Sequence, residues 1–303
     1  MIVLKQVIIM ALLILTGVIC YKTNVISKEA SKSLSSLVLM VVNPIVIIVS
    51  YQVEFDKKLL KGLLLALLFS VISIGAAIIL SHILLRKKGE RLSLERFSCI
   101  YSNCGFMGIP LVNGVYGSEG VFYLTAFMTV FNILVWTHGV FMMKGEFKWK
   151  MIVKAVKTPV IIATVLGFVL FIAKIQLPAI VFETLSFLGN MNTPLAMIAA
   201  GVTIAQTNIL HSLKNPRLYL VAVISLIIVP AVSSLILCFM PASSIVTGTV
   251  ILASACPAAA TGTLFAIRFK KDSLYASELF AVTTLLSIIT LPVVMSVAQK
   301  LIN

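Results

Sequence analysis

Acidic residues are scarce in this sequence: ten Asp and Glu occur among 303 residues, and they are scattered rather than clustered. A membrane enzyme that holds a diphosphate through a metal ion needs clustered carboxylates, and a sodium site built on carboxylates needs them beside its binding segment. The five cysteines lack metal-ligand spacing, and we expect them to be small buried residues. The sequence therefore predicts no metal site, no cofactor and no enzymatic activity.

Charge of either sign is also rare, at 11% of residues, against 60% hydrophobic residues and a mean hydropathy of +1.12. This composition excludes an ordinary soluble globular domain. A transmembrane helix needs about 20 apolar residues, so the chain has room for about ten of them and, we expect, for no extramembrane domain. The apolar run from Met1 to Tyr21 lacks the small-residue cleavage site of a signal peptide, and we interpret it as the first helix.

We therefore predict an all-α integral membrane protein with ten transmembrane helices. They are placed near residues 5–21, 34–53, 60–85, 97–118, 120–143, 154–174, 179–206, 217–240, 244–268 and 274–299. The net charge of +14 does not indicate a nucleic-acid partner, because the basic residues lie in short loops between apolar spans. Eighteen of the 24 Lys and Arg fall in the loops after the odd-numbered helices, including the loop from Lys144 to Lys157. By the positive-inside rule these loops are cytoplasmic, which predicts a multi-pass protein of the cell membrane with both termini outside the cytoplasm.

Two apolar spans contain residues that interrupt a helix. The first, residues 99–118, holds glycines, asparagines and Pro110, and we expect the helix to break just before that proline. The second, residues 254–263, holds Pro257 and Gly262. Freed backbone groups at membrane depth are tolerated only where they are buried in protein or line a cavity. Paired interruptions of this kind indicate a transport site.

The two halves of the chain resemble each other in an ordered series of residues. Gly17 and Pro44 recur 150 residues later as Gly167 and Pro194, and Pro110 recurs as Pro257. Five helices in each half, residues 1–150 and 151–303, imply an inverted repeat, because an odd number of spans reverses the direction of entry. The two broken helices, the fourth and the ninth, are then expected to cross near the middle of the membrane.

The predicted crossing has the chemistry of an anion site. Pro110 and Pro257 suit the first position of a half-helix, where a missing N–H costs nothing. The free N–H groups and the helix dipole at each half-helix start would hold a carboxylate without a basic side chain. The predicted substrate-binding residues are Asn103, Gly105, Gly108, Pro110, Asn113, Cys256, Pro257, Thr261, Gly262 and Thr263. The alternative is that the glycines and prolines only permit tight helix packing.

Two further groups are candidates with open alternatives. The Asn-Pro pairs, Asn43 with Pro44 and Asn192 with Pro194, either line the substrate path or only kink their helices. Glu278 lies about two turns into the tenth helix, and a carboxylate there is a candidate for coupling transport to an ion. Its alternative role is an interfacial ion pair near Arg268 or Lys271.

The motif from Asn103 to Leu111, NCGFMGIPL, with Tyr116 and Gly117 after it, resembles the fourth helix of the auxin efflux carrier family. That family includes plant PIN-type carriers and bacterial organic-acid permeases for substrates such as malate or malonate. The segments PLAM at 194–197, with Gly201, and TLLSIITLP at 284–292 resemble its bacterial members, and the similarity spans nearly the whole chain. Cys104 and the alanines at 258–260 depart from the family pattern, which leaves the substrate open and argues against auxin itself.

The resemblance implies a fold similar to that of sodium/proton antiporters and bile-acid transporters. Helices 1, 2, 6 and 7 would form a scaffold, helices 3–5 and 8–10 a moving transport unit, and the carrier would be a homodimer. Asn103, Pro110 and Pro257 match family residues at the crossover. The implied function is a secondary carrier of a small organic anion, a mono- or dicarboxylate, coupled to protons or sodium. A sodium-coupled symporter of the bile-acid type, a channel and a membrane enzyme remain alternatives.

Overall fold

A computed structural model describes residues 2–86, 89–145, 153, 156–207, 212 and 214–302. Over these residues the regular structure is helical, apart from one isolated backbone bridge. Seven of the described helical segments are long and apolar enough to cross a membrane, and two shorter apolar helices cover Pro159–Ile172 and Ser244–Ala255. The expected all-α membrane class is confirmed. The division into ten spans and the inverted repeat stay predictions, and the expected boundary at 150 and 151 lies outside the described residues.

The described elements follow in chain order. The first half contains α1 (Ile2–Lys22), α2 (Lys28–Leu37), η1 (Val38–Val42), α3 (Asn43–Ser50), α4 (Lys57–Leu84), α5 (Leu92–Ile100), η2 (Cys104–Gly108), α6 (Ile109–Leu134), η3 (Val135–Gly139) and α7 (Val140–Lys144). The second half contains α9 (Pro159–Ile172), α10 (Ala179–Asn190), α11 (Asn192–Ala205), α13 (Pro216–Val223), η4 (Ile224–Ile228), α14 (Val229–Leu237), α15 (Ser244–Ala255), α16 (Thr261–Arg268) and α17 (Ser273–Ile302). The η elements are π-helical turns.

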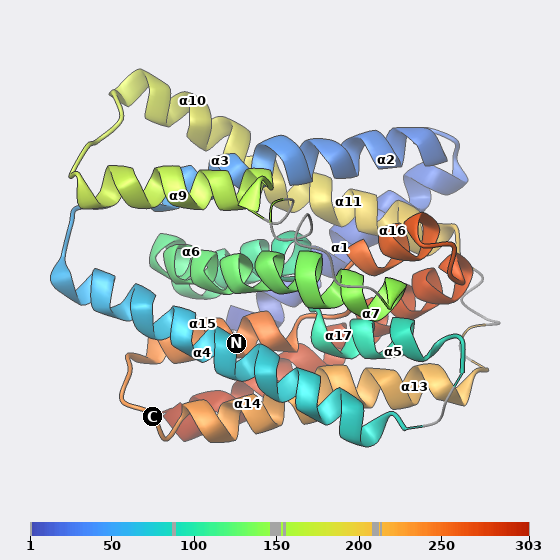
Figure 1. The fold of residues 1–303 in the computed structure, drawn as a ribbon. Helices are drawn as coiled ribbons and strands as arrows, with labels where there is room; N and C mark the ends of the chain where they lie inside the picture. Colours follow the sequence, from blue (N-terminus) through green and yellow to red (C-terminus); the bar gives the residue numbers. More distant parts are fainter. Residues whose placement is uncertain are drawn as a thin grey trace.

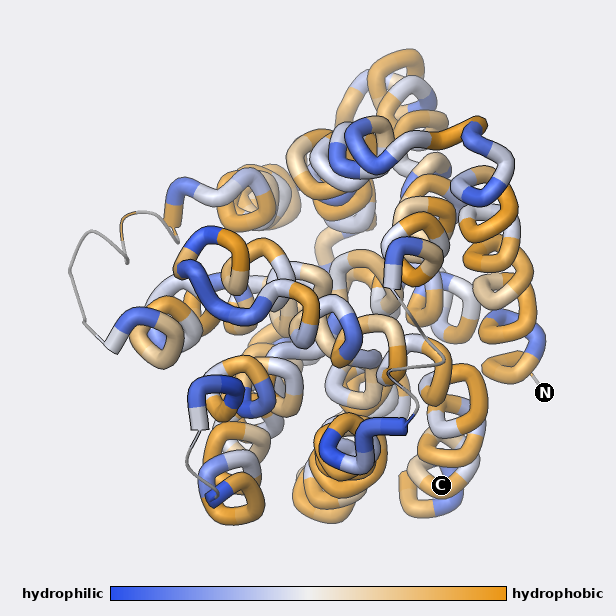
Figure 2. Tube along the Cα trace, turned by 90° about the vertical axis from the view of Figure 1, so that its right-hand side faces the viewer, coloured by the Kyte–Doolittle hydropathy of each residue, from blue (hydrophilic) through white to orange (hydrophobic). Residues whose placement is uncertain are grey.

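Most helices run along one common direction, so that their connections gather at two opposite ends of the molecule (Figure 1). The connections at 23–27 and 269–272 and the described residues 85–86 and 89–91 lie at one end, and the connections at 51–56, 173–178 and 238–243 lie at the other. Seen along the bundle, hydrophilic residues concentrate at the connections while the helices are largely hydrophobic (Figure 2). At the first of these ends the connections contain Arg86, Arg91, Lys270 and Lys271, whereas Lys174 is the lysine or arginine described in the connections at the other end, and we call the first end the basic end.

Three of the four π-turns come immediately before a proline. η1, η2 and η4 each end two residues before Pro44, Pro110 and Pro230, respectively. A proline lacks the N–H of a regular helix and its ring clashes with the carbonyl four residues earlier. A turn closed by an i→i+5 bond, such as Ile109 N–H to Cys104 O, widens the helix there and accommodates the ring.

The expected helix break just before Pro110 is therefore wrong in its position. Helical structure runs without interruption from Cys104 through Pro110, and the break lies earlier, between the end of α5 at Ile100 and the start of η2. A second irregularity follows at Gly117, whose φ of +65° inside α6 marks a kink between two merged helices. Glycine adopts this left-handed backbone without the steric cost of a side chain.

α1 and α11 pack with unusually close backbones because each contributes a glycine. A Cβ on Gly17 would collide with the carbonyl oxygen of Ile198, and one on Gly201 would collide with that of Ile14. Small residues at helix interfaces allow such approach in membranes, where close packing supplies much of the association energy. The pair fixes α1 against α11, and α11 in turn carries Asn192 to the centre of the molecule.

Candidate functional site

The two interrupted segments meet and bond to each other through their backbones. Ser102 and Ala258 form an antiparallel bridge. Asn103 N–H donates to Pro257 O at 2.7 Å, and Ala259 N–H donates to Tyr101 O at 2.9 Å. We call residues 101–103 and 256–259 the junction. The breaks thus satisfy part of each other's freed backbone groups, and a ligand is needed only for what remains.

Pro257 lies in the extended part of the junction, not at the start of a half-helix. α15 ends at Ala255, and α16 begins only at Thr261, so the expectation of a helix that starts at Pro257 is wrong. The residues between them form hydrogen bonds to other segments, including one from Ala258 N–H to the Thr283 hydroxyl on α17 at 3.2 Å. These hydrogen bonds stabilise the extended backbone, and a sequence pattern does not show which distant residues supply them.

The two helices that start beside the junction differ in how many first-turn N–H groups lack an acceptor within the helix. At η2 the first helical bonds are those of Met107 and Gly108 N–H to Asn103 O, so the preceding three N–H groups have no partner within the helix. At α16 the tight bonds from Gly262 N–H to Ala259 O and from Thr263 N–H to Ala260 O close the first turn at once. The start of η2 is therefore the stronger positive helix end of the two.

Several polar side-chain atoms near the junction are buried without a hydrogen-bond partner. Asn103 is 5% exposed and its Nδ2 has no acceptor, and the hydroxyls of Ser102, Thr261 and Thr263 are likewise unpartnered. A buried donor left without an acceptor costs about 1–3 kcal/mol. Such groups are expected where a ligand or water completes the site.

A cavity of about 270 Å³ lies between α6 on one side and α3, α10 and α11 on the other. Its lining includes three of the predicted site residues, namely Pro110, Asn113 and Asn192. Gln52 and Val53, from the connection at 51–56, extend it toward the end of the molecule opposite the basic end. Half of its lining residues are polar, and none of them is charged. Any attraction for an anion must come from amides, hydroxyls and helix dipoles.

The remaining predicted residues are not part of this lining. Of the predicted substrate-binding residues, those outside the cavity lie at or near the junction: Asn103, Gly105, Gly108, Cys256, Pro257, Thr261, Gly262 and Thr263. Asn43, Pro44 and Pro194 are also outside the lining. A Cβ on Gly108 would lie 3.4 Å from Cys104 Cβ and 3.8 Å from Cys256 Sγ, so this glycine and both thiols share one packed region. The structure thus divides the predicted site between a junction and an adjacent cavity.

The two asparagines of the predicted Asn-Pro pairs contact each other. Asn192 Nδ2 donates to Asn43 Oδ1, and both side chains are at most 2% exposed. The bond leaves Asn43 Nδ2 and Asn192 Oδ1 without partners. A Cβ on Gly105 would lie only 3.2 Å from Asn43 Nδ2, so the amide of this pair packs closely against the start of η2. Pro44 and Pro194 lie in the first turns of α3 and α11, where a helix tolerates proline, so both roles predicted for these pairs stay open.

Gln52 is a cavity residue that sequence reasoning missed. Its Oε1 accepts the Leu177 N–H at 2.7 Å, while its Nε2 is buried without a partner. In the sequence, Gln52 is a polar residue directly after the apolar stretch that ends near Tyr51, and a polar residue in a surface loop would give the same pattern. The hydrogen bond to Leu177, in the α9–α10 connection, places Gln52 against a distant segment, and this contact cannot be read from the sequence.

Glu278 is buried, with 8% exposure, as the sixth residue of α17. Among the described residues no ion pair joins it to Arg268 or Lys271. A carboxylate that does form a buried ion pair is Glu95, which sequence reasoning missed. Arg217 donates to both of its oxygens, at 2.8 and 2.7 Å, and the Tyr275 hydroxyl donates at 3.0 Å. This cluster ties α5 to α13 and α17.

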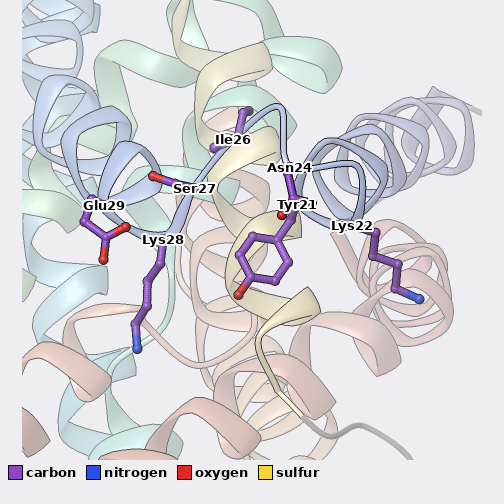
Figure 3. A pocket seen from close by; sticks show the side chains of 7 residues that line it. All are labelled: Tyr21, Lys22, Asn24, Ile26, Ser27, Lys28 and Glu29. Carbon is purple, nitrogen blue, oxygen red and sulfur yellow. The ribbon is translucent and has the colours of Figure 1, made fainter.

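Another hollow lies at the turn between α1 and α2, at the basic end (Figure 3). Its lining residues are Tyr21, Lys22, Asn24, Ile26, Ser27, Lys28 and Glu29. Most of these residues are exposed, and the Ser27 hydroxyl already accepts the Ala30 N–H as a helix cap. The hollow therefore has none of the buried unpartnered groups that mark the junction.

A membrane bundle with two interrupted segments bonded to each other beside a polar cavity is typical of secondary transporters. The model of the membrane transport protein family matches residues 2–149 and 145–295. The chain belongs to this family, and the resemblance to auxin efflux carriers is confirmed. It is 25% identical to an uncharacterized transporter of Methanothermobacter thermautotrophicus, over 92% of this chain and 93% of that protein. It is also 25% identical to an uncharacterized transporter of Methanocaldococcus jannaschii, over 68% of this chain and 70% of that protein.

Proposed function

We propose that this protein is a secondary carrier that moves a small organic anion, a mono- or dicarboxylate, across the cell membrane. The observation that carries the proposal is a set of three buried amide nitrogens without acceptors: Asn43 Nδ2, Gln52 Nε2 and Asn103 Nδ2. They lie on segments that border the cavity or the junction. A carboxylate, with about four acceptor positions, is the ligand best suited to such donors.

The start of η2 adds favourable electrostatics. The first N–H groups of this element have no partner within the helix, and they and the positive end of the helix dipole attract negative charge. The cavity contains no basic side chain that would hold an anion too tightly for release. An uncharged polar lining also suits an anion that must leave on the other side. The alternative that the glycines and prolines serve packing alone leaves the unpartnered amides unexplained.

The position of the cavity supports alternating access of the elevator type. α3, α10 and α11 belong to the expected scaffold, and α6 to the expected transport unit, so the cavity lies along their mutual boundary. A transport unit that slides along this boundary would carry an anion held at η2 from one end of the molecule to the other. A homodimer through the scaffold helices is part of the same proposal, by analogy with related carriers.

Glu278 is the proposed coupling group for protons. It is a carboxylate on α17, the helix whose Thr283 binds the junction through Ala258 N–H, so its charge acts on the transport unit itself. A sodium-coupled symporter of the bile-acid type is the alternative within transport. No carboxylate contacts the junction among the described residues, which favours protons over a sodium site built on carboxylates.

The test is a thermal-shift screen of the purified protein against organic acids, followed by counterflow in liposomes. A ligand that binds only the folded state raises the unfolding temperature as its concentration increases. Counterflow of a labelled hit against an unlabelled excess separates a carrier from a channel, because solutes equilibrate independently through a channel and the label does not accumulate transiently. Stabilisation by cations or neutral solutes alone, with none of the acids active, would contradict the proposal.

A further inference from the structure

The Asn43–Asn192 pair has two unmatched hydrogen-bonding groups beside the cavity. Asn192 lines the cavity from the first turn of α11, and Asn43 packs against Gly105 of η2. The bond between the two amides uses the Asn192 Nδ2 donor and the Asn43 Oδ1 acceptor. Asn43 Nδ2 and Asn192 Oδ1 are buried and have no partners. The pair therefore lacks a partner both for a donor and for an acceptor.

This imbalance does not depend on how the two amides are turned. Each side-chain amide has an NH₂ donor group and an oxygen acceptor, and one bond between two amides joins the donor group of one to the acceptor of the other. Turning both amides over makes Asn43 the donor of the bond and leaves Asn43 Oδ1 and Asn192 Nδ2 unmatched. In either arrangement the pair keeps one buried donor group and one buried acceptor without partners.

The acceptor distinguishes this pair from the other amides of the site. The unmatched amide nitrogens at the junction, in the cavity lining or next to it are those of Asn43, Gln52 and Asn103, whereas Asn192 has an unmatched oxygen. An ionised carboxylate accepts hydrogen bonds from nitrogens, but it has no hydrogen to donate to an oxygen. A buried acceptor without a donor destabilises the complex as an unmatched donor does. A simple carboxylate therefore leaves Asn192 unsatisfied.

A hydroxyl group on the substrate supplies the missing donor. It has one hydrogen, which matches one unmatched oxygen, and it is uncharged, as is every side chain of the cavity lining. An ammonium group has three hydrogens and a full positive charge, and the lining residues include no carboxylate to pair with it. A hydroxyl group therefore fits the cavity better than an ammonium group does.

A second carboxylate fits the cavity poorly. Its charge would be buried without a basic side chain in the lining. In addition, α3 ends at Ser50, and Val49, Ser50 and Gln52 line the cavity around this helix end. The last carbonyl groups of a helix form the negative end of its dipole, which repels an anion and attracts a hydrogen-bond donor. The start of η2 thus favours a negative charge, and the end of α3 favours a donor.

We propose that the transported anion is a small hydroxy monocarboxylate. Its carboxylate binds at the start of η2 with Asn103, and its hydroxyl donates to the unmatched oxygen of the Asn43–Asn192 pair. The inference rests on the proposed carrier function and narrows its substrate class. A site built to bond a substrate hydroxyl rejects the analogue that lacks it, because the buried oxygen would then stay unmatched. The pair is therefore assigned the role of a specificity determinant.

The test compares four-carbon acids that differ in one functional group, by thermal-shift titration of the purified parent protein. The probes are butyrate, its three positional hydroxy derivatives, 2-oxobutyrate and succinate, and any larger acid from the screen is compared with its own deoxy analogue. One of the hydroxy acids should bind about ten- to a hundredfold more tightly than butyrate, the effect of satisfying one buried polar group. 2-Oxobutyrate and succinate should bind no more tightly than butyrate. Equal binding of every hydroxy acid and its deoxy analogue, or tightest binding of succinate, would overturn the inference.

The role of the pair is tested by replacing both asparagines with leucine. The double variant Asn43→Leu/Asn192→Leu leaves neither amide of the pair without its partner, which a single substitution would do. The ratio of affinities for the hydroxy acid and its deoxy analogue should fall to about one, even though both affinities fall with the loss of Asn43 Nδ2. Asn132→Leu is the matched control, because Asn132 Nδ2 donates to Met128 O in its own helix, outside the cavity lining. A preference that survives in the double variant would exclude the pair as its source.

The result for this inference is separable from the result for the carrier function. Binding and counterflow of acids without any preference for the hydroxy members would contradict the substrate class and leave the carrier function standing. If no acid of the screen binds, the proposed function is contradicted, and this inference with it.

Discussion

At the scale of single residues, the candidate site is defined by amides whose hydrogens lack acceptors. The position of Asn103 beside an interrupted helix was predictable, because the glycines and Pro110 that follow it mark an interruption in this apolar span. The pairing of Asn43 with Asn192 was not predictable, since the bond joins residues 149 positions apart. Composition and spacing indicate that such residues are special, but contacts between distant segments decide which atoms remain free.

Asn103→Ala is expected to weaken binding of the anion. The substitution removes a charge-assisted hydrogen bond worth about 1.5–3 kcal/mol, which corresponds to roughly a ten- to a hundredfold loss of affinity. Binding is measured by titrating the thermal shift with the acid identified in the screen. Asn24→Gly serves as the control, because Asn24 lies in an exposed turn with φ at +59°, which glycine tolerates. Parental affinity in Asn103→Ala would place the site elsewhere.

Gln52→Glu tests the cavity with a change of almost no volume. The new carboxylate keeps an oxygen for the Leu177 N–H and replaces the unpartnered Nε2 donor with negative charge. We expect the affinity for an anion to fall at least about tenfold, by loss of a donor and by repulsion, with little change in stability. Gln206→Glu is a matched control outside the cavity. Equal binding by Gln52→Glu and the parent protein would exclude Gln52 from the site.

Glu278→Gln tests proton coupling. The amide keeps the size of the side chain but cannot take up a proton in the working range, so uptake driven by a proton gradient should be lost while ligand binding remains measurable. Uptake into proteoliposomes is compared with and without a pH gradient. Glu183→Gln is the control, because Glu183 lies on α10, where none of the residues is buried. Coupling is not at Glu278 if gradient-driven uptake persists in this variant.

At the scale of elements, the sequence correctly indicates the two interrupted spans but misplaces both breaks. The reason is physical in each case. Before Pro110 the helix absorbs the missing N–H with a π-turn, and the interruption moves to residues 101–103. After Ala255 the backbone stays extended until Thr261, because Tyr101, Asn103 and Thr283 supply its hydrogen-bond partners. A proline therefore marks such a region without fixing its boundary.

Pro110→Ala is expected to depress transport without preventing folding. Alanine restores the N–H, which allows η2 to re-form as a regular helix; removing the extra residue of a π-turn rotates the preceding segment by about 100°. Asn103 would then turn away from its present direction, and transport should fall by about tenfold or more. Counterflow is measured beside Pro230→Ala, which follows the equivalent π-turn η4 away from the cavity. Equal losses in both variants would indicate a general effect on packing instead of one on the site.

At the scale of the whole molecule, composition was sufficient to predict an integral membrane protein, because 60% hydrophobic and 11% charged residues exclude an ordinary soluble domain. The regular structure of the described residues is helical, as that prediction requires. The junction itself also follows in outline from the paired interruptions. The cavity does not, because its lining comes from α3, α6, α10 and α11, whose mutual packing depends on contacts such as the one between Gly189 of α10 and Val46 of α3. Such contacts depend on the shapes of the two helix surfaces, which a hydropathy pattern does not describe.

The orientation of the bundle in the membrane is the last prediction. The connections at one end carry most of the described loop cations, and the positive-inside rule assigns that end to the cytoplasm. In a background lacking all five native cysteines, Lys28→Cys and Lys57→Cys each place a thiol at an exposed position, at the basic end and at the opposite end, respectively. An impermeant maleimide should label Lys57→Cys in intact cells and Lys28→Cys only after permeabilisation. The reverse pattern would invert the topology, and the cavity beside Gln52 and Ser118 would then face the cytoplasm.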